Sequence, residues 1–456
     1  MNSLFRAPAA RGIKKLDTSL FSKVLPTTAA AVRDNKLLSK YRKHLEKSDE
    51  LLRLRTISPI VEDPSPTAAK GQKCLLLAAE LKRSAPETWG PVLQEAVKAG
   101  DLTLREYDVH LDYSHWSYYD VMKSILPEEL ADEIPVGFNS AGHVAHLNLR
   151  DRYLPYRYVI AEAIIDKNPT IRTVINKIDN VGGESEFRTF AYEVLAGPDD
   201  LEVEVHEANC TFKFDYSKTY WNTKLSTEHA RLVSLFEPGQ VVADVMAGIG
   251  PFAVPAGKKG VFVWANDKNP ESYNYLKDAM KRNKTGDFVR PFNEDGHDFI
   301  RFAADDVLRA SKATEHAHLP APKHSRKSLE PPPKPVRVDI PPTISHFVMN
   351  LPASALEFLH NFRGIYEGQE ALFSPATQTK LPIVHAHCFA LKGDDEVAFK
   401  EICDRIEAEI GVRLKSGKMG VEGEVEITEV RDVAPSKRMF CASFRIPSQV
   451  AFASRK

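Results

Sequence analysis

The residues best suited to bind a cofactor lie in one run, 241–252. An apolar stretch ends there in a turn that contains Gly248 and Gly250, and Pro251 then suits the first turn of a helix. Glycines let the backbone approach a ligand closely. Asp267 follows where a second strand should end, and a carboxylate at that place can accept both hydrogen bonds from a ribose diol. The pattern predicts a site for a nucleoside-bearing cofactor.

Two later motifs choose between NAD and S-adenosylmethionine, which both use this architecture. Asp295-Gly296 falls where the tip of a third strand should place an acid near an adenine edge. Asn350-Leu351-Pro352 directly follows the apolar stretch 344–349. An Asn-x-Pro at a strand end holds a carboxamide and a rigid turn beside the reactive end of the cofactor, as in base-modifying methyltransferases. These motifs favour S-adenosylmethionine.

The residues around Pro352 also exclude two kinds of methyltransferase. No cysteine follows the Asn-Leu-Pro motif, which weighs against the covalent cysteine mechanism used on C5 of pyrimidines. No aromatic residue follows Pro352, which weakens the case for an adenine N6-methyltransferase.

The elements that must position these motifs alternate between strands and helices after residue 222. Such alternation predicts a parallel sheet with helices on both faces. A closing hairpin, 424–430 with 439–446, typifies methyltransferases rather than dehydrogenases. We therefore predict an α/β, Rossmann-like class I methyltransferase domain over 223–456. Its remaining strands are expected at 241–245, 261–265, 344–349 and 383–390.

Composition divides the rest of the chain. Leu37, Leu38, Tyr41 and Leu45 keep helical spacing and predict a helical module over 36–134. Short β-rich runs predict a middle α+β domain over 135–222.

One segment interrupts the α/β alternation. Residues 312–342 carry eight prolines after residue 319 and few apolar side chains, and they predict a disordered insertion within the methyltransferase domain.

Bulk properties bound the class of protein. The 456 residues carry a net charge of −1, so a protein that coats nucleic acid by bulk electrostatics is disfavoured, although a local basic surface is not. No apolar run approaches the roughly 18 residues of a membrane span. The five cysteines form no C-x-x-C pair, so no metal site is expected and a reducing compartment is the easier fit.

The N-terminal segment, 1–35, is basic at its start. Arg6, Arg11, Lys14 and Lys15 precede the first acid, Asp17. A mitochondrial presequence and a disordered basic terminus both fit this pattern. We expect the protein in cytoplasm and nucleus, with a pool in the mitochondrial matrix.

Several motifs in one order carry a specific resemblance. They are 215–222 (DYSKTYWN), 225–229 (LSTEH), 248–252 (GIGPF), 350–352 (NLP) and 441–445 (CASFR). Over about 135–456 the chain resembles the eukaryotic and archaeal tRNA (guanine-N1-)-methyltransferases, which modify the guanine 3′ of the anticodon, position 37. The resemblance implies S-adenosylmethionine as cofactor, tRNA as substrate, no membrane and a monomer. Residues 36–134 would touch the tRNA elbow.

The resemblance also assigns roles to single residues. Guanine N1 carries a proton at neutral pH, so its methylation needs a base and a donor that stabilises charge on O6. Glu228 matches the family's catalytic carboxylate, Arg188 the arginine thought to contact O6, and Asn350 would position the guanine. Tyr220 could line the flipped base. Lys224 stands where archaeal relatives often have arginine, so its charge is kept and bidentate geometry is lost.

The implied cofactor-binding set combines these motifs. It comprises His229, Asp244, Gly248, Gly250, Asp267, Lys268, Asp295, Gly296 and Asn350.

Three alternatives remain open. A transferase that moves the aminocarboxypropyl group of the same cofactor in wyosine synthesis shares the fold, and Glu228 discriminates against it. Intact Asp267, Glu228 and Asn350 argue against a non-catalytic tRNA-binding protein. Two modules before the catalytic domain disfavour a small-molecule methyltransferase.

Overall fold

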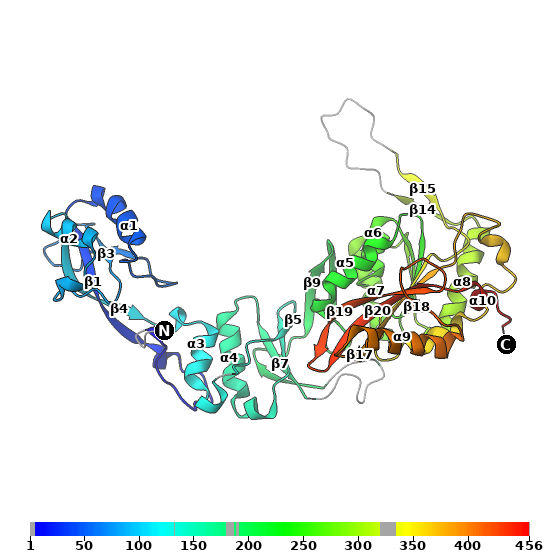
Figure 1. Cartoon of the computed structure of the whole chain (residues 1–456), viewed down its shortest axis with the longest axis horizontal. Coiled ribbons are helices and arrows are strands. Elements are labelled where there is room, and N and C mark those ends of the chain that lie inside the picture. The colour runs from blue at the N-terminus through cyan, green and yellow to red at the C-terminus, as the bar shows by residue number, and fades with distance from the viewer. Residues whose placement is uncertain (1–4, 132, 179–186, 188–190, 320–333, 456) are drawn as a thin grey trace. The chain divides into compact units, whose positions relative to one another are not determined.

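The computed structural model describes residues 5–131, 133–178, 187, 191–319 and 334–455 (Figure 1). The chain forms two compact units. Unit 1 comprises Met1–Gly137, Leu149–Pro169 and Leu195–Gly197, and unit 2 comprises Phe138–Asn148, Thr170–Val194 and Pro198–Lys456. The predicted boundary near 135 lies close to Gly137, whereas the predicted middle domain, 135–222, is shared between the two units.

Unit 1 is built on an antiparallel sheet of order β2-β3-β1-β4. Strand β1 pairs with β4 along its whole length, and α1 and α2 pack their apolar residues on one face of the sheet. Helices α3 and α4 also belong to this unit. The bounds are β1 Lys23–Val32, α1 Leu38–Lys47, β2 Ile60–Glu62, β3 Lys73–Leu76, α2 Pro91–Lys98, β4 Leu102–Leu111, α3 Tyr118–Ile125 and α4 Arg157–Lys167.

The prediction of a helical module over 36–134 is therefore wrong in its secondary structure. The helical spacing around Tyr41 is real and forms α1. The apolar run from Cys74, however, forms the buried strand β3, because a short apolar run does not distinguish a buried strand from a buried helix. Strand β1 lies within the predicted N-terminal segment, 1–35, so that segment contributes to the sheet.

The start of the chain packs on other parts of unit 1. Arg11 donates to the backbone oxygens of Lys123 and Leu126, and the Leu16 amide donates to Glu162 at 2.8 Å. The ammonium of Lys14 lies 3.3 Å from the centre of the Tyr156 ring. The alternative of a disordered basic terminus is therefore wrong for the described part of this segment.

Unit 2 contains an eight-stranded sheet of order β13-β12-β11-β16-β17-β20-β19-β18. The first five strands are parallel, and β20 is antiparallel to both β17 and β19. The bounds are β11 Val241–Asp244, β12 Phe262–Asn266, β13 Val289–Phe292, β16 His346–Met349, β17 Ile383–Leu391, β18 Lys415–Ser416, β19 Glu424–Ala434 and β20 Lys437–Arg445. The predicted class I methyltransferase fold with a C-terminal hairpin is confirmed.

Helices cover both faces of this sheet (Figure 1). Alternate residues of each strand divide the core in two: Ala243 and Phe347 pack with α8 and α9, whereas Val242 and Val348 pack with α5, α6 and α7. The bounds are α5 Ser226–Leu235, α6 Ala253–Lys259, α7 Pro270–Asn283, α8 Gly296–Lys312 and α9 Asp395–Ile410. Strand order reverses between β11 and β16, and ligands of open α/β sheets bind at such a switch point.

Two smaller sheets are formed by strands that precede β11 in the chain. Strands β5 to β8 form a four-stranded sheet, and β9 pairs with β10. The bounds are β5 Asn139–Ala141, β6 Val144–Leu147, β7 Thr173–Lys177, β8 Tyr192–Ala196, β9 Glu202–Glu207 and β10 Cys210–Asp215.

The predicted disorder of 312–342 is wrong at both ends of that segment. Strand β14, His316–Leu319, pairs antiparallel with β15, Val336–Asp339, and Ala317 and Ile340 are buried in the core. Backbone pairing between the two ends supplies order that a polar, proline-rich composition does not reveal. Residues 320–333 lie outside the described residues. None of the described helices is long and apolar enough to cross a membrane.

Candidate active site

A cavity of about 330 Å³ in unit 2 lies where β11, β12 and β16 end, beside the start of α8. It is lined by eight of the predicted site residues, which come from separate stretches of the sequence. They are Tyr220, His229, Gly248, Asp267, Lys268, Asp295, Gly296 and Asn350.

Asp267 fastens the glycine turn to the end of β12. One carboxylate oxygen accepts the Gly248 amide at 2.7 Å, and the other accepts the Asn269 amide at 2.9 Å. Burial raises the pKa of Asp267, and the amides of Asn269 and Gly248 oppose that shift. The Ser272 hydroxyl is a third donor, and because a carboxylate accepts about four hydrogen bonds, an acceptor position remains for a ribose hydroxyl.

The two predicted glycines are needed for different reasons. Both have positive φ, +56° at Gly248 and +95° at Gly250. A Cβ at Gly248 would have no atom within 4 Å, so this position leaves room for a ligand, whereas a Cβ at Gly250 would lie 2.7 Å from Leu276. Gly248 lines the cavity and Gly250 packs against α7, so Gly250 shapes the turn from behind.

Asp295, another of the predicted acids, caps α8. Asp295 accepts the backbone amide of His297 at 2.9 Å and pairs with the Lys268 ammonium at 2.9 Å. These two contacts lower the pKa of Asp295. At Gly296 a Cβ would lie 3.0 Å from the Phe358 ring, so glycine lets that ring reach the cavity wall.

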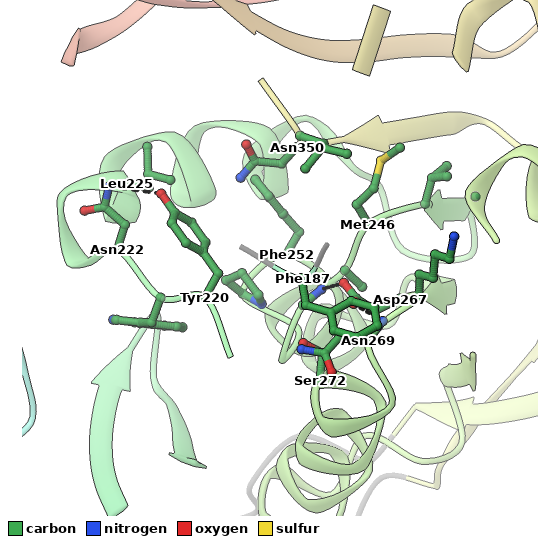
Figure 2. Close-up of a pocket in the computed structure, with 18 of the residues that line it drawn as sticks. Phe187, Tyr220, Asn222, Leu225, Met246, Phe252, Asp267, Asn269, Ser272 and Asn350 are labelled. Carbon is green, nitrogen blue, oxygen red and sulfur yellow. Dashed lines mark hydrogen bonds between the residues drawn. The ribbon is translucent and has the colours of Figure 1, made fainter. Parts of the chain in front are cut away.

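The two ends of the cavity differ in chemistry. Figure 2 shows Asp267, Asn269 and Ser272 grouped at one end, away from Asn350 and Leu225. Near the second end the Tyr220 hydroxyl lies 3.3 Å from the Asn222 amide nitrogen. The first end offers acceptors for sugar hydroxyls, and the second offers a carboxamide and an aromatic ring.

His229 is buried at the cavity wall. Its Nδ1 lies 2.5 Å from a carboxylate oxygen of Glu207, and its ring meets Phe252 edge-on at 4.7 Å between centroids. These contacts fix the imidazole in place.

Glu228 is buried next to the cavity but does not line it. Both carboxylate oxygens accept from the Arg231 guanidinium, at 2.7 and 2.8 Å, and His387 Nε2 lies 2.8 Å from one of them. Burial would raise the pKa of Glu228, but the hydrogen bonds from Arg231 and His387 outweigh it and lower the pKa to about 2. In this arrangement the carboxylate is ionised and fully engaged.

Three other predicted residues lie away from the cavity or outside the described residues. Asp244 is fully buried, and neither of its carboxylate oxygens has a hydrogen-bond partner in the part of the chain that the structure describes. Burial raises its pKa well above the usual value. Lys224 is exposed and does not line the cavity. Arg188 lies outside the described residues, next to Phe187, which does line the cavity.

Sequence reasoning missed two groups of residues. The His297 ring stacks on Phe358 at 3.9 Å, with 12° between the planes, and both rings line the cavity. His297 adjoins the Asp295-Gly296 motif, which was a usable signal, whereas nothing in the sequence placed Phe358 beside it. Arg231 and His387 were also missed. The alternation of His385 and His387 in an apolar strand was the available signal for the second group.

The cavity fits S-adenosylmethionine. The turn at Gly248 is open where a backbone must approach a ligand, Asp267 retains an acceptor position for a ribose hydroxyl, and stacked aromatic rings border the same space. The polar side chains, with the Asp267 carboxylate at one end and the Asn350 carboxamide at the other, suit a nucleoside joined to an amino acid.

Comparison with known proteins identifies the family. Residues 118–200 match the TYW2 N-terminal domain, and residues 203–327 match the TRM5/TYW2 methyltransferase domain. A protein of Fusarium vanettenii named tRNA (guanine(37)-N(1))-methyltransferase is 64% identical over 99% of this chain and 98% of its own length. A protein of the same name from Neurospora crassa is 59% identical over 99% of this chain and 96% of its own length.

The chain belongs to the family of tRNA (guanine(37)-N(1))-methyltransferases. Family membership confirms the predicted resemblance, the methyltransferase class and S-adenosylmethionine as cofactor. The fold agrees with solved structures. Trm5b from Pyrococcus abyssi superposes with a TM-score of 0.58 at 20% identity, over 92% of this chain and 99% of that one. The complex structure of aTrm5 and tRNALeu gives 0.57 at 18% identity, over the same shares of the two chains.

Proposed function

We propose that this protein transfers the methyl group of S-adenosylmethionine to N1 of the guanosine at position 37 of tRNA. The observation that carries the proposal is the cavity at the switch point of a methyltransferase fold, in a chain 64% identical along nearly its whole length to a tRNA (guanine(37)-N(1))-methyltransferase. When bound, the cofactor supplies an electrophilic methyl group.

The residues at the two ends of the cavity divide the work. Asp267 and the glycine turn would hold the ribose, and the stacked rings of His297 and Phe358 border the space for a base. Asn350 would hold the guanine by its carboxamide, and the Tyr220 ring would lie against it. Arg188 would stabilise charge on O6, and Lys224 would contact a phosphate.

Glu228 is the proposed general base. The reaction replaces the N1–H bond of guanine by an N1–CH3 bond, so the proton must pass to an acceptor. Glu228 lies on α5 directly before His229, which lines the cavity. To accept the proton, its carboxylate has to exchange its present partners for N1–H.

Incubation with unmodified tRNA and labelled cofactor tests the activity. We expect label in 1-methylguanosine at position 37 when the cofactor is labelled in its methyl group, and none when it is labelled in its carboxyl group. A tRNA with adenosine at position 37 is the matched control and should stay unlabelled. Transfer of carboxyl label would identify an aminocarboxypropyl transferase, and no transfer at all would favour a binding protein.

We infer that the monomer is the active form, which sedimentation of the active protein would check. We also infer a mitochondrial pool beside cytoplasm and nucleus, from the basic residues Arg6 to Lys15. A reporter fused to the first forty residues should then enter mitochondria, and a diffuse reporter would contradict this.

A further inference from the structure

Glu228 is held by three charge-assisted hydrogen bonds from two elements. Arg231, one turn further along α5, binds both carboxylate oxygens, and His387 on β17 binds one of them. His387 is fully buried, and the Arg231 side chain is partly exposed. A carboxylate bound in this bidentate way is fixed in direction as well as in charge.

Polar side chains of β17 and β20 lie next to Glu228 on one face of the sheet. His387 pairs with Cys441 across β17 and β20, and His385 pairs with Ser443, so all four side chains share the face covered by α5. His385 Nδ1 lies 2.8 Å from the Ser443 hydroxyl, and its Nε2 lies 3.0 Å from His346 Nδ1. A row of buried polar side chains therefore underlies Glu228 in a core that is otherwise apolar.

The charged and titratable groups around Glu228 lie on α5, β17 and β20. Arg231 faces it from α5, His387 from β17 and Cys441 from β20, while Asp244 on β11 acts on His387. Ligand-type atoms of Glu228, His387 and Cys441 converge within 4.8 Å. Because Arg231 already engages both carboxylate oxygens, the group is an ion-pair network and not a metal site.

The balance of forces on the carboxylate depends on these partners. Burial favours the neutral carboxyl, and the hydrogen bonds from Arg231 and His387 override it. A carboxylate held this strongly is a weak base. Without those partners, burial would raise the pKa of the same carboxylate and make it a much stronger base. General bases work best when their pKa approaches the operating pH.

We propose that Arg231 and His387 are positioning residues, which store the Glu228 carboxylate beside the cavity and release it when guanine N1–H takes their place. The inference rests on the proposed role of Glu228 as base. In each turnover the N1–H bond breaks, and its proton joins the carboxylate as N1 forms its bond to the methyl carbon. Return of the carboxyl group to Arg231 and His387 restores the ionised form and passes the proton to water.

The pH profile of single-turnover methyl transfer tests the proposal on the full-length protein. Glu228 must be ionised to act, so a raised pKa moves the acid limb of the profile to higher pH. Arg231→Gln removes the bidentate partner, and its rate should fall by about tenfold for each pH unit below the new pKa, within the range where the wild type stays level. Arg231→Lys keeps the charge without the paired donors and should restore part of the profile.

A matched control comes from α8. Arg309 pairs with Asp306 at the same i,i+3 spacing, and neither residue lines the cavity. Arg309→Gln should keep the wild-type profile.

The outcomes separate this inference from the base assignment. If Glu228→Gln is as active as the wild type, the base assignment is wrong. If Glu228→Gln is inactive while folded Arg231→Gln and Arg231→Lys keep the wild-type profile, the positioning role is overturned and the base stands. A loss of rate that is equal at every pH also overturns it, because a purely structural defect gives that result.

A second measurement needs neither activity nor a folded Arg231 variant. Burial opposes protonation of His387, but Cys441 and Glu228 outweigh it and raise the pKa of the imidazole to about 10. In 15N-histidine NMR spectra of the wild-type protein, with His387 assigned from His387→Gln, this ring should stay protonated through neutral pH. Glu228→Gln should lower that pKa. A wild-type His387 that titrates in the ordinary histidine range would contradict the proposal.

Discussion

Two carboxylates beside the same cavity are held in opposite ways. Asp267 accepts two backbone amides of the turn that it fastens, with the Ser272 side chain as a further donor, so its direction follows largely from the path of the chain. Among the described residues, Glu228 accepts from side chains alone, Arg231 on α5 and His387 on β17. Burial raises the pKa of Asp267, whereas side-chain partners lower that of Glu228 to about 2.

This difference matches the two proposed roles, ribose binding by Asp267 and proton transfer by Glu228. A carboxylate tied to backbone amides has partners whose positions the path of the chain fixes, which suits a residue that must present fixed acceptors to a sugar. A carboxylate tied to side chains exchanges partners by rotation of those side chains, which suits a residue that must gain and lose a proton.

Glu228→Gln should have the largest effect. The amide keeps the size of the side chain but does not act as a base at neutral pH, so single-turnover methyl transfer should fall by about 10²–10⁴-fold. Cofactor and tRNA affinity should change little, and raising the pH should restore part of the rate as guanine loses its own proton. A loss that traced wholly to weaker cofactor binding would place Glu228 on the binding side of the comparison.

Asp267→Ala should act on binding and not on the proton. The ribose would lose hydrogen bonds to a charged acceptor, each contributing about 1.5–3 kcal/mol, so calorimetry should show S-adenosylmethionine affinity lower by at least about tenfold. Asp287→Ala, an exposed acid before β13, is the control. Unchanged affinity in Asp267→Ala would remove this residue from the site.

Gly250→Ala should test how much the backbone turn matters. Its φ of +95° opposes alanine, and so does Leu276, which would lie 2.7 Å from the added methyl group, so urea unfolding should show a loss of about 1–3 kcal/mol. Gly286 has no atom within 4 Å of such a methyl group, and Gly286→Ala should be close to neutral. Equal stability of the two variants would refute the steric argument.

Removal of 320–333 should have the smallest effect on either carboxylate. A short Gly/Ser linker between β14 and β15 keeps their pairing, and turnover should stay within about twofold of the wild type. Removal of 316–339, which includes both strands, should destabilise the protein because Ala317 is buried. Loss of cofactor binding in the folded shorter deletion would show that the segment supports the site.

Local patterns predicted much of the methyltransferase domain. The strands β11, β12, β16 and β17 were expected within a few residues, because apolar runs between turns bound them clearly. The N-terminal module was misjudged because its strands lack such clear signals. Its buried strand β3 has no periodicity, and the central strand β1 begins in a segment whose charge suggested a leader.

The sequence by itself determined the glycine turn, Asp267 and the motif at Asn350, because each depends on a strand end and the few residues after it. The Arg231 contact of Glu228 is local, three residues along α5, and only the tertiary structure decided the contact with His387. His387 is 159 residues away in the chain, and its side chain reaches Glu228 because β17 pairs with β16 and β20 in one register and α5 covers that face. A shift of one residue would turn His387 to the opposite face, and the residues near Glu228 in sequence do not fix that register.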